Sequence, residues 1–283
     1  MKRHFLLLPL FGALASVFLT VPGWAAGGAE SDQSTQPGDQ IQVAMTMYAG
    51  GIGFGKMDLD TTFQGNDYHS VSNFQTSGVV NAFWQSEIQA TSSGKVGAKS
   101  LEPGLYDSFD INRTGKKQEV SLTYQNGVPK LYADPVYSTT GFEVKPEDQM
   151  NTLDPLSAVT YIVSGVALNA GDPCNLSTRI FDGRRLYSIA MTKVKDTDIK
   201  MDNGLYAGKA ALCQVRYKAI GGMRPRVLRT NEAFPLINVW MVTLNGTAGH
   251  SFAVPVRLWA DTPYGQLSIV ADTMKLNGAT PKP

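Results

Sequence analysis

Histidine and cysteine are scarce in this chain, which has three histidines and two cysteines among 283 residues. Outside the first few residues only His69 and His250 remain, so a metal centre built on several imidazoles is excluded. An excess of one charge is also missing, because 25 basic side chains meet 24 acidic ones. A net charge of +1 gives no global attraction to nucleic acid. We expect no metal, no cofactor and no nucleic acid partner.

The first 25 residues have the pattern of an export signal. A basic head at positions 2–4 precedes an apolar run at 5–21, and small residues at 23 and 25 frame a cleavage site. An uncleaved membrane anchor is the alternative, but the run is near the lower length limit for spanning a bilayer. We predict export to a bacterial periplasm, followed by a flexible lead-in over residues 26–40.

Cys174 and Cys213 are the only cysteines, and both lie after the export signal. In an oxidising compartment an even number of cysteines favours a disulfide. A redox-active pair would need close spacing such as C-x-x-C, which the chain lacks. The sequence therefore predicts a structural bridge between Cys174 and Cys213.

The rest of the chain alternates between apolar and polar residues with a period of two, which is typical of β-strands. Turn dipeptides separate the alternating segments, among them Asn126-Gly127, Asp182-Gly183, Asn203-Gly204 and Asn245-Gly246. One helix is expected after Asp154, with Pro155 in its first turn and Gly165 beyond its end. We predict an all-β fold, mainly antiparallel: one curved or spiral sheet, or a half-open barrel, with one short central helix. It forms a single domain over residues 41–277, and residues 278–283 form a flexible tail.

Several segments imitate catalytic or binding motifs without completing them. The glycine-rich stretch 50–56 resembles a phosphate-binding loop, but Met57 stands where Ser or Thr would hold a metal ion. The acidic stretch 196–204 has Lys200 where a calcium loop needs an oxygen ligand. A nucleophile elbow, G-x-S-x-G, is missing. We interpret the first two segments as hairpin turns and do not expect an enzyme.

One stretch carries a local excess of positive charge. Between Asp202 and Glu232 there are six basic side chains and no acidic one. The candidate site for anionic groups consists of Arg216, Lys218, Arg224, Arg226 and Arg229. The alternative is a solvated strand face balanced by carboxylates on neighbouring strands.

Four large aromatic side chains fall on predicted strands: Phe83, Trp84, Trp240 and Trp259. Side chains of this size are usually part of a core. A curled sheet could instead use them to line an apolar cavity, so we retain them as candidate cavity-lining residues.

Several segments together resemble one family of exported bacterial envelope proteins, the domain-of-unknown-function 3108 family. They are residues 48–55, 153–158, 181–187, 212–220, 254–257 and 262–265, together with the cysteine pair. The resemblance extends from about residue 41 to 276. It implies a location and a curved β fold but no reaction. The pattern also resembles, more distantly, β-spiral envelope-integrity proteins and half-open lipoprotein carriers.

These observations favour a non-catalytic periplasmic protein that supports the cell envelope. It would bind a lipid, an anionic envelope glycolipid or an envelope protein, with peripheral membrane contact. A structural interaction module with a filled core is the alternative. A hydrolase of envelope polymers is a remote one, and it would need a pocket that joins His69 or His250 to a carboxylate and a hydroxyl.

Overall fold

The computed structural model describes residues 38–78, 85–112, 115–138, 141–224, 228, 234–263 and 265–281. Thirteen antiparallel strands form one sheet. They are β1 (Asp39–Ala49), β2 (Ile52–Gln64), β3 (Asp67–Thr76), β4 (Ser86–Val96), β5 (Leu101–Asn112), β6 (Lys117–Gln125), β7 (Val128–Asp134), β8 (Leu176–Phe181), β9 (Leu186–Lys200), β10 (Ala207–Gly221), β11 (Ile237–Asn245), β12 (Ser251–Thr262) and β13 (Gly265–Leu276).

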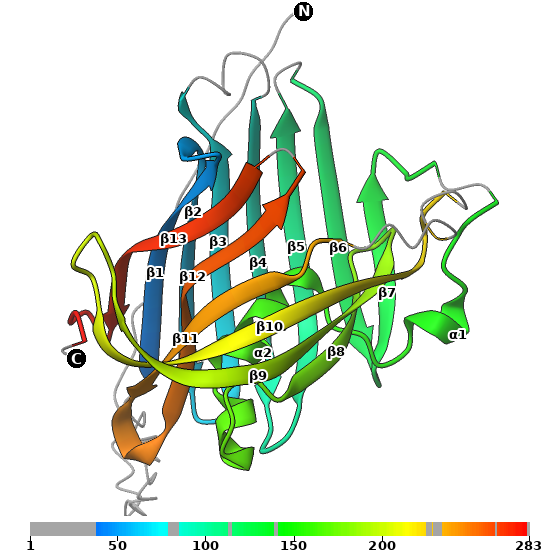
Figure 1. Ribbon diagram of the computed structural model, residues 1–283. Helices are drawn as coiled ribbons and strands as arrows, with labels where there is room; N and C mark the ends of the chain where they lie inside the picture. The colour runs from blue at the N-terminus through cyan, green and yellow to red at the C-terminus, as the bar shows by residue number, and fades with distance from the viewer. Residues whose placement is uncertain are drawn as a thin grey trace, which may run out of the picture. The chain divides into compact units, whose positions relative to one another are not determined.

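The strands meander in both directions from a central pairing of β1 with β13. The order across the sheet is β7-β6-β5-β4-β3-β2-β1-β13-β12-β11-β10-β9-β8. Val43 pairs with Met274, so the central contact joins opposite ends of the sequence. The sheet curves until β8–β12 cross in front of β1–β6, and its two outermost strands, β7 and β8, do not pair (Figure 1). The predicted all-β, half-open fold is confirmed.

The turn dipeptides explain why consecutive strands pair. Asn126 and Gly127 both have positive φ, at 52° and 75°, as a two-residue type I′ turn requires. Gly50 and Gly51 close the β1–β2 hairpin in the same way, with φ of 56° and 83°. The glycine-rich stretch at 50–56 is thus a hairpin, as predicted. The acidic stretch at 196–204 is only partly a turn, since β9 continues through Lys200.

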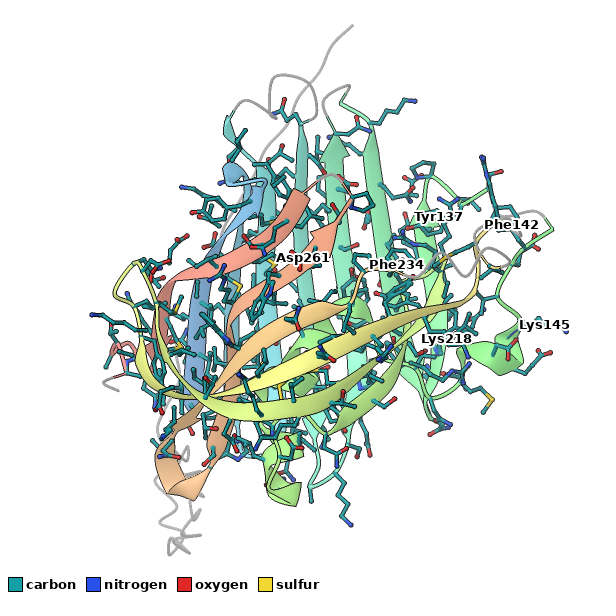
Figure 2. The ribbon with its side chains drawn as sticks, in the orientation of Figure 1. Tyr137, Phe142, Lys145, Lys218, Phe234 and Asp261 are labelled. Carbon is teal, nitrogen blue, oxygen red and sulfur yellow. A yellow bond between two sulfur atoms is a disulfide. The ribbon has the colours of Figure 1, made fainter. Side chains whose placement is uncertain are left out.

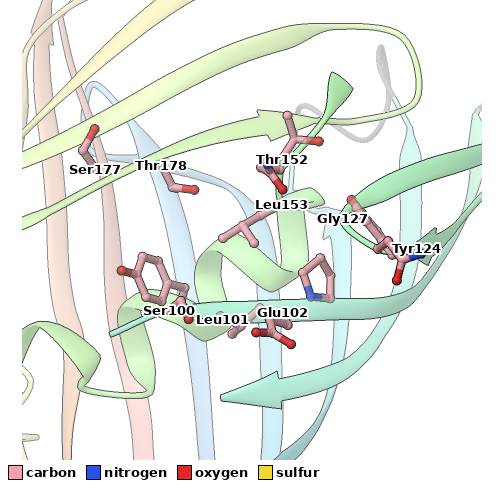
Figure 3. Close-up of a pocket in the computed structure, with 13 residues that line it drawn as sticks. Ser100, Leu101, Glu102, Tyr124, Gly127, Thr152, Leu153, Ser177 and Thr178 are labelled. Atoms are coloured by element: carbon pink, nitrogen blue, oxygen red, sulfur yellow. The ribbon is translucent and has the colours of Figure 1, made fainter. Parts of the chain in front are cut away.

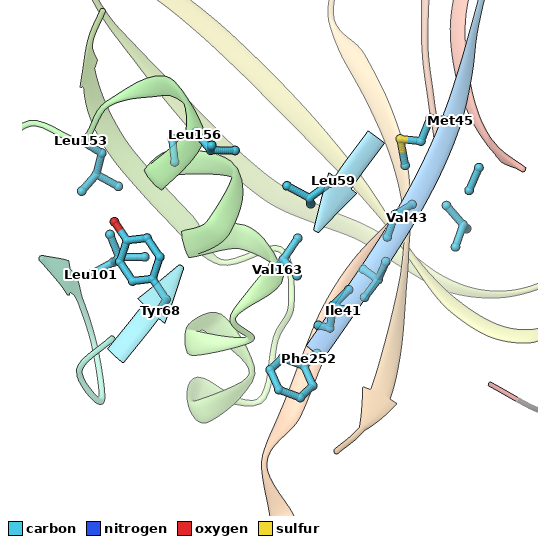
Figure 4. Packing of buried hydrophobic residues seen from close by; sticks show 14 of the residues in the cluster. Ile41, Val43, Met45, Leu59, Tyr68, Leu101, Leu153, Leu156, Val163 and Phe252 are labelled. Atoms are coloured by element: carbon cyan, nitrogen blue, oxygen red, sulfur yellow. The ribbon is translucent and has the colours of Figure 1, made fainter. Parts of the chain in front are cut away.

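The predicted helix is α2 (Pro155–Val163), and Asp154 caps it by accepting a hydrogen bond from the backbone N of Ser157 at 2.7 Å. A one-turn helix, α1 (Pro146–Gln149), and the 3₁₀ segment η2 (Val166–Ala170) lie before and after it. The helix packs inside the curled sheet against strands from both halves, including β3, β4, β8 and β12. Figure 4 shows Val163 between Ile41 and Leu59, near Phe252. The helix fills this part of the interior.

A disulfide fixes the second half of the sheet. Cys174 and Cys213 are bonded and fully buried, with their Cα atoms 5.5 Å apart. The bond ties the segment before β8 to β10. A small apolar cluster surrounds it, including Met191, Val239 and Met241.

Candidate functional site

The predicted anion-binding residues lie at the end of β10. Arg216, Lys218 and Ile220 are exposed along one face of this strand, and Ile220 is 38% exposed. Their neighbours on β9 are small and uncharged, because Arg216 pairs with Ala190 and Lys218 with Ser188. Among the described residues, no carboxylate forms an ion pair with Arg216, Lys218 or Arg224. The alternative of cross-strand neutralisation therefore does not hold on β9.

The tertiary structure brings the β8–β9 turn, with Arg184 and Arg185, to this end of β10. In the β8–β9 turn, Asp182 accepts hydrogen bonds from the backbone N of Arg184 and Arg185, at 3.0 and 2.6 Å, and from the Arg185 Nε at 2.7 Å. Gly222 packs directly on this turn. A Cβ at Gly222 would lie 1.9 Å from the Arg184 carbonyl oxygen, and its φ is +71°. Only glycine permits this approach, which brings Arg184 to the end of β10.

Aromatic side chains cover the other face of the same region. The rings of Tyr187 and Tyr217 stack with centroids 5.0 Å apart. The centroid of the Phe234 ring lies 4.2 Å from that of Tyr217. Phe234 is nevertheless 52% exposed. Arg184 lies over the ring of Tyr137 at 5.8 Å. Figure 2 shows Tyr137, Lys218 and Phe234 at the end of the molecule where the two sheet edges come together. We call the exposed side chains Arg184, Arg216, Lys218, Ile220 and Arg224 the basic end.

Four predicted residues cannot be placed: Arg226, Arg229, Phe83 and Trp84 lie outside the described residues. Trp240 and Trp259 are half-buried and share a face of β11 and β12. Their rings meet edge to face at 5.3 Å, with Arg257 over both, at 5.3 and 5.4 Å from the centroids. Neither tryptophan contributes to the wall of the two clefts described next.

A cleft of 640 Å³ lies where the two edges of the sheet approach each other. Its walls come from β5, the β6–β7 turn, the segment before α2 and β8 (Figure 3). The lining is mixed, with Glu102, Tyr124, Asn151, Tyr161 and Ser177 among its polar members. Its lining has no basic side chain, which separates it chemically from the basic end.

A fully buried carboxylate lies at the start of α2. Asp154 accepts hydrogen bonds from the Ser157 backbone N and from the hydroxyls of Ser157 and Ser92. It has no ion-pair partner among the described residues. Burial raises the pKa of this carboxyl to about 6, and the hydrogen bonds from Ser157 oppose that rise.

Hydroxyl groups continue this polar contact between α2 and the sheet. The Tyr68 hydroxyl lies 2.7 Å from the Ser157 Oγ, and the Ser70 Oγ lies 2.6 Å from the Thr160 Oγ1. Burial, and then the charge of Asp154, raise the pKa of Tyr68 to about 12. Tyr124 differs, because its hydroxyl is buried and has no hydrogen-bond partner among the described residues. Burial raises the pKa of Tyr124 as well.

The predicted export signal lies outside the described residues, and the two histidines that follow it in the sequence lie in unrelated places. His69 is exposed on β3, whereas His250 precedes β12 and its Nε2 lies 2.9 Å from the Ser164 carbonyl oxygen. His250 lines a second cleft, of 490 Å³, together with Asp39 and Thr247. In that cleft the Asp39 carboxylate accepts from the Thr247 backbone N at 3.0 Å and from the Asn277 Nδ2 at 2.7 Å. These bonds join the start of β1 to the β11–β12 connection and to the residue after β13, and they do not orient the imidazole.

Within the part of the chain that the structure describes, no three His, Cys, Asp or Glu side chains group as metal ligands would. In the same residues, no helix has both the length and the apolar character needed to cross a bilayer.

The comparisons with known proteins support the fold and the family. No curated protein matches the sequence. Among solved structures, the chain is similar to a β-barrel-like protein of the domain-of-unknown-function 1849 family from Brucella abortus, with a TM-score of 0.51 and 11% identity, over 86% of this chain and 98% of that one. At this identity the likeness concerns the fold alone. The sequence model of the family named Protein of unknown function (DUF3108) matches residues 42–272, nearly the whole sheet. The chain therefore belongs to the DUF3108 family.

Proposed function

We propose that this protein is a non-catalytic periplasmic protein that attaches to anionic phosphate groups of the envelope surface through its basic end. The observation that carries the proposal is the row of Arg216, Lys218 and Ile220, which are exposed on one face of β10. The β9 residues opposite Arg216 and Lys218 are uncharged. Arginine forks match phosphate oxygens, and an adjacent apolar side chain can enter the interface between headgroups and acyl chains.

The filled interior favours contact at the surface over enclosure of a lipid. Residues from α2 and from both halves of the sheet form one buried cluster that includes Ile41, Leu156, Val163, Val254 and Met274. This cluster is closely packed, and the two clefts that lie outside it have no lysine or arginine in their lining. The envelope ligand would therefore be held at the basic end by its charged headgroup.

Vesicle binding tests the proposal. Each basic side chain near an anionic bilayer contributes about 1 kcal/mol, so replacing three should weaken binding roughly 100-fold. We expect the variant Arg216→Gln/Lys218→Gln/Arg224→Gln to lose that affinity for vesicles containing phosphatidylglycerol, measured by co-sedimentation. Neither the wild-type protein nor this variant should bind vesicles of pure phosphatidylcholine.

The β9–β10 hairpin, which carries Arg216 and Lys218, also offers a matched control. Lys193, Lys195 and Lys209 are exposed at its other end, where Lys193 and Lys209 pair with Asp196 and Asp198 at 2.7 and 2.9 Å. The variant Lys193→Gln/Lys195→Gln/Lys209→Gln removes the same formal charge and should retain most of the binding. Equal losses in both variants would mean that only net charge matters, and no loss in the first would exclude the basic end.

A structural interaction module is the second candidate, and the filled core favours it. Such a protein would act through protein contacts and would show no vesicle binding above that to neutral lipid. Native mass spectrometry of the protein purified from periplasm separates the two candidates further, because a module of this kind would carry no stoichiometric lipid.

A further inference from the structure

We propose that the free edge of β7 pairs with β7 of a second copy of this chain, antiparallel and centred on Tyr132. In this arrangement Leu131 lies opposite Ala133 of the second copy, and Lys130 lies opposite its Asp134. The inference is independent of the basic end, and it rests on the direction of the backbone groups, the exposure of the strand and its pattern of charges.

The direction of the backbone groups follows from the β6–β7 turn. A two-residue turn closes on a hydrogen-bonded pair, here Gln125 and Val128. By alternation, residues 128, 130, 132 and 134 bond to β6, whereas Leu131 and Ala133 direct their N–H and C=O groups away from it. The backbone position of Pro129 is also directed away from β6, so the N–H group that proline lacks removes no hydrogen bond from the β6–β7 pair.

The edge of β7 is uncovered in the part of the chain that the structure describes. Val128 and Leu131 are each 40% exposed, Tyr132 is 55% exposed, and Val136 just beyond the strand is 85% exposed. No backbone bond reaches Leu131 or Ala133 from another described segment. The β8 edge differs, because Leu153 bridges it with backbone bonds to Arg179 and Phe181 at 2.9 and 2.8 Å. An apolar strand with open backbone groups is a template for strand addition.

Charge selects the partner and the register. Each copy offers two outward N–H groups, so neighbouring registers would make equal numbers of hydrogen bonds. When Tyr132 faces its own counterpart, however, Lys130 of each copy lies directly opposite Asp134 of the other, which gives two cross-strand ion pairs. Within one chain Asp134 pairs with Glu119, so two carboxylates lie side by side. A lysine from the second copy would offset their repulsion.

Analytical ultracentrifugation of the purified protein tests the dimer. A contact of one strand edge is smaller than a standard interface, so we expect a dissociation constant on the order of micromolar. Lys130→Asp places like charges opposite each other and should raise that constant at least about tenfold, as should Asp134→Lys. The double variant Lys130→Asp/Asp134→Lys should restore dimerisation. An equimolar mixture of the two single variants should form a heterodimer.

Cross-linking tests the register. Tyr132 would face its counterpart as a non-hydrogen-bonded pair, with Cα atoms about 4.5 Å apart, which suits a disulfide. Because the described residues contain no free cysteine, Tyr132→Cys supplies a single thiol, and it should give a covalent dimer on mild oxidation. Lys130→Cys, on the same face two residues away, should not.

Three results would overturn the inference. The first is a monomer at concentrations well above micromolar. The second is a dimer that is indifferent to the charge reversals, and the third is a Lys130→Cys variant that cross-links as readily as Tyr132→Cys. Circular dichroism of each variant verifies that the exposed substitutions leave the fold intact.

Discussion

Two buried regions of this protein are equally closed to water but are built from opposite chemistry. Around Cys174–Cys213 the packing is apolar, with Met191, Val239 and Met241 against the disulfide. Where α2 faces β3 and β4, the contact consists of hydroxyls and the carboxylate of Asp154. The difference teaches that burial by itself does not determine the role of a region. The apolar cluster stabilises the fold by burial. The polar contact specifies where the helix lies, because any other position would leave buried polar groups without hydrogen bonds and destabilise the folded state.

Removing the cross-link from the apolar region should have the largest effect. The bond closes a loop with a sequence separation of 39, for which chain entropy predicts about 4 kcal/mol. We expect Cys174→Ala/Cys213→Ala to lose that much unfolding free energy in urea titrations. A loss below about 1 kcal/mol would show that the packing around Cys174 and Cys213 stabilises this region without the bond.

The polar region should respond to pH. The carboxyl of Asp154 has a pKa of about 6 in the folded protein, above the ordinary value of 3.8. The folded state therefore binds a proton more tightly than the unfolded state, and this group makes the protein more stable at pH 4 than at pH 7. The difference should be about 2–3 kcal/mol, lost as the pH rises through 6.

Asp154→Asn isolates this contribution, because the amide can still accept from the Ser157 backbone N and carries no charge. We expect its unfolding free energy to vary less between pH 4 and pH 7 than that of the wild type, by about 2 kcal/mol. In the Cys174→Ala/Cys213→Ala background, the unfolding free energy should change between pH 4 and pH 7 by the same amount as in the wild type. A variant with an unaltered pH profile would mean that Asp154 is not the titrating group.

Two tyrosines give the finest test of hydrogen bonding in the polar region. Tyr68 is buried, whereas Tyr124 is partly buried with a buried hydroxyl. Of these two hydroxyls, only that of Tyr68 has hydrogen-bond partners among the described residues, Ser157 and Ser92, at 2.7 and 3.3 Å. We expect Tyr68→Phe to destabilise the protein by about 1 kcal/mol and Tyr124→Phe to be neutral or slightly stabilising. Thermal unfolding of the two variants side by side measures the contrast, and equal effects would contradict it.

Local signals predicted much of the fold. The turn at Asn126-Gly127 and the cap at Asp154 each depend on a few neighbouring residues, and both form as expected. The disulfide could be predicted because only one pairing of two cysteines exists. The basic residues of β10 were also visible as a run without acids.

Other features carried no local signal. Thr61, Ser70 and Ser92 are polar residues on strands, a pattern that indicates solvent, yet all three are buried against or near α2. The approach of Arg184 to β10 depends on Gly222, which lies nearly forty residues later in the chain and looks like an ordinary turn glycine. In both cases the deciding contact comes from another element.

The sequence by itself determined the strands, their turns, the capped helix and the disulfide, because each follows from periodicity, backbone preference or the number of cysteines. Only the tertiary structure decided which polar residues meet α2 and which arginines gather at the basic end. It also decided that, among the described residues, a backbone segment bridges the edge of β8 and none pairs with the edge of β7. The physical reason is that β-sheet contacts join residues distant in sequence, as Val43 and Met274 show. A side chain on a strand takes its environment from the partners that the completed fold brings to it.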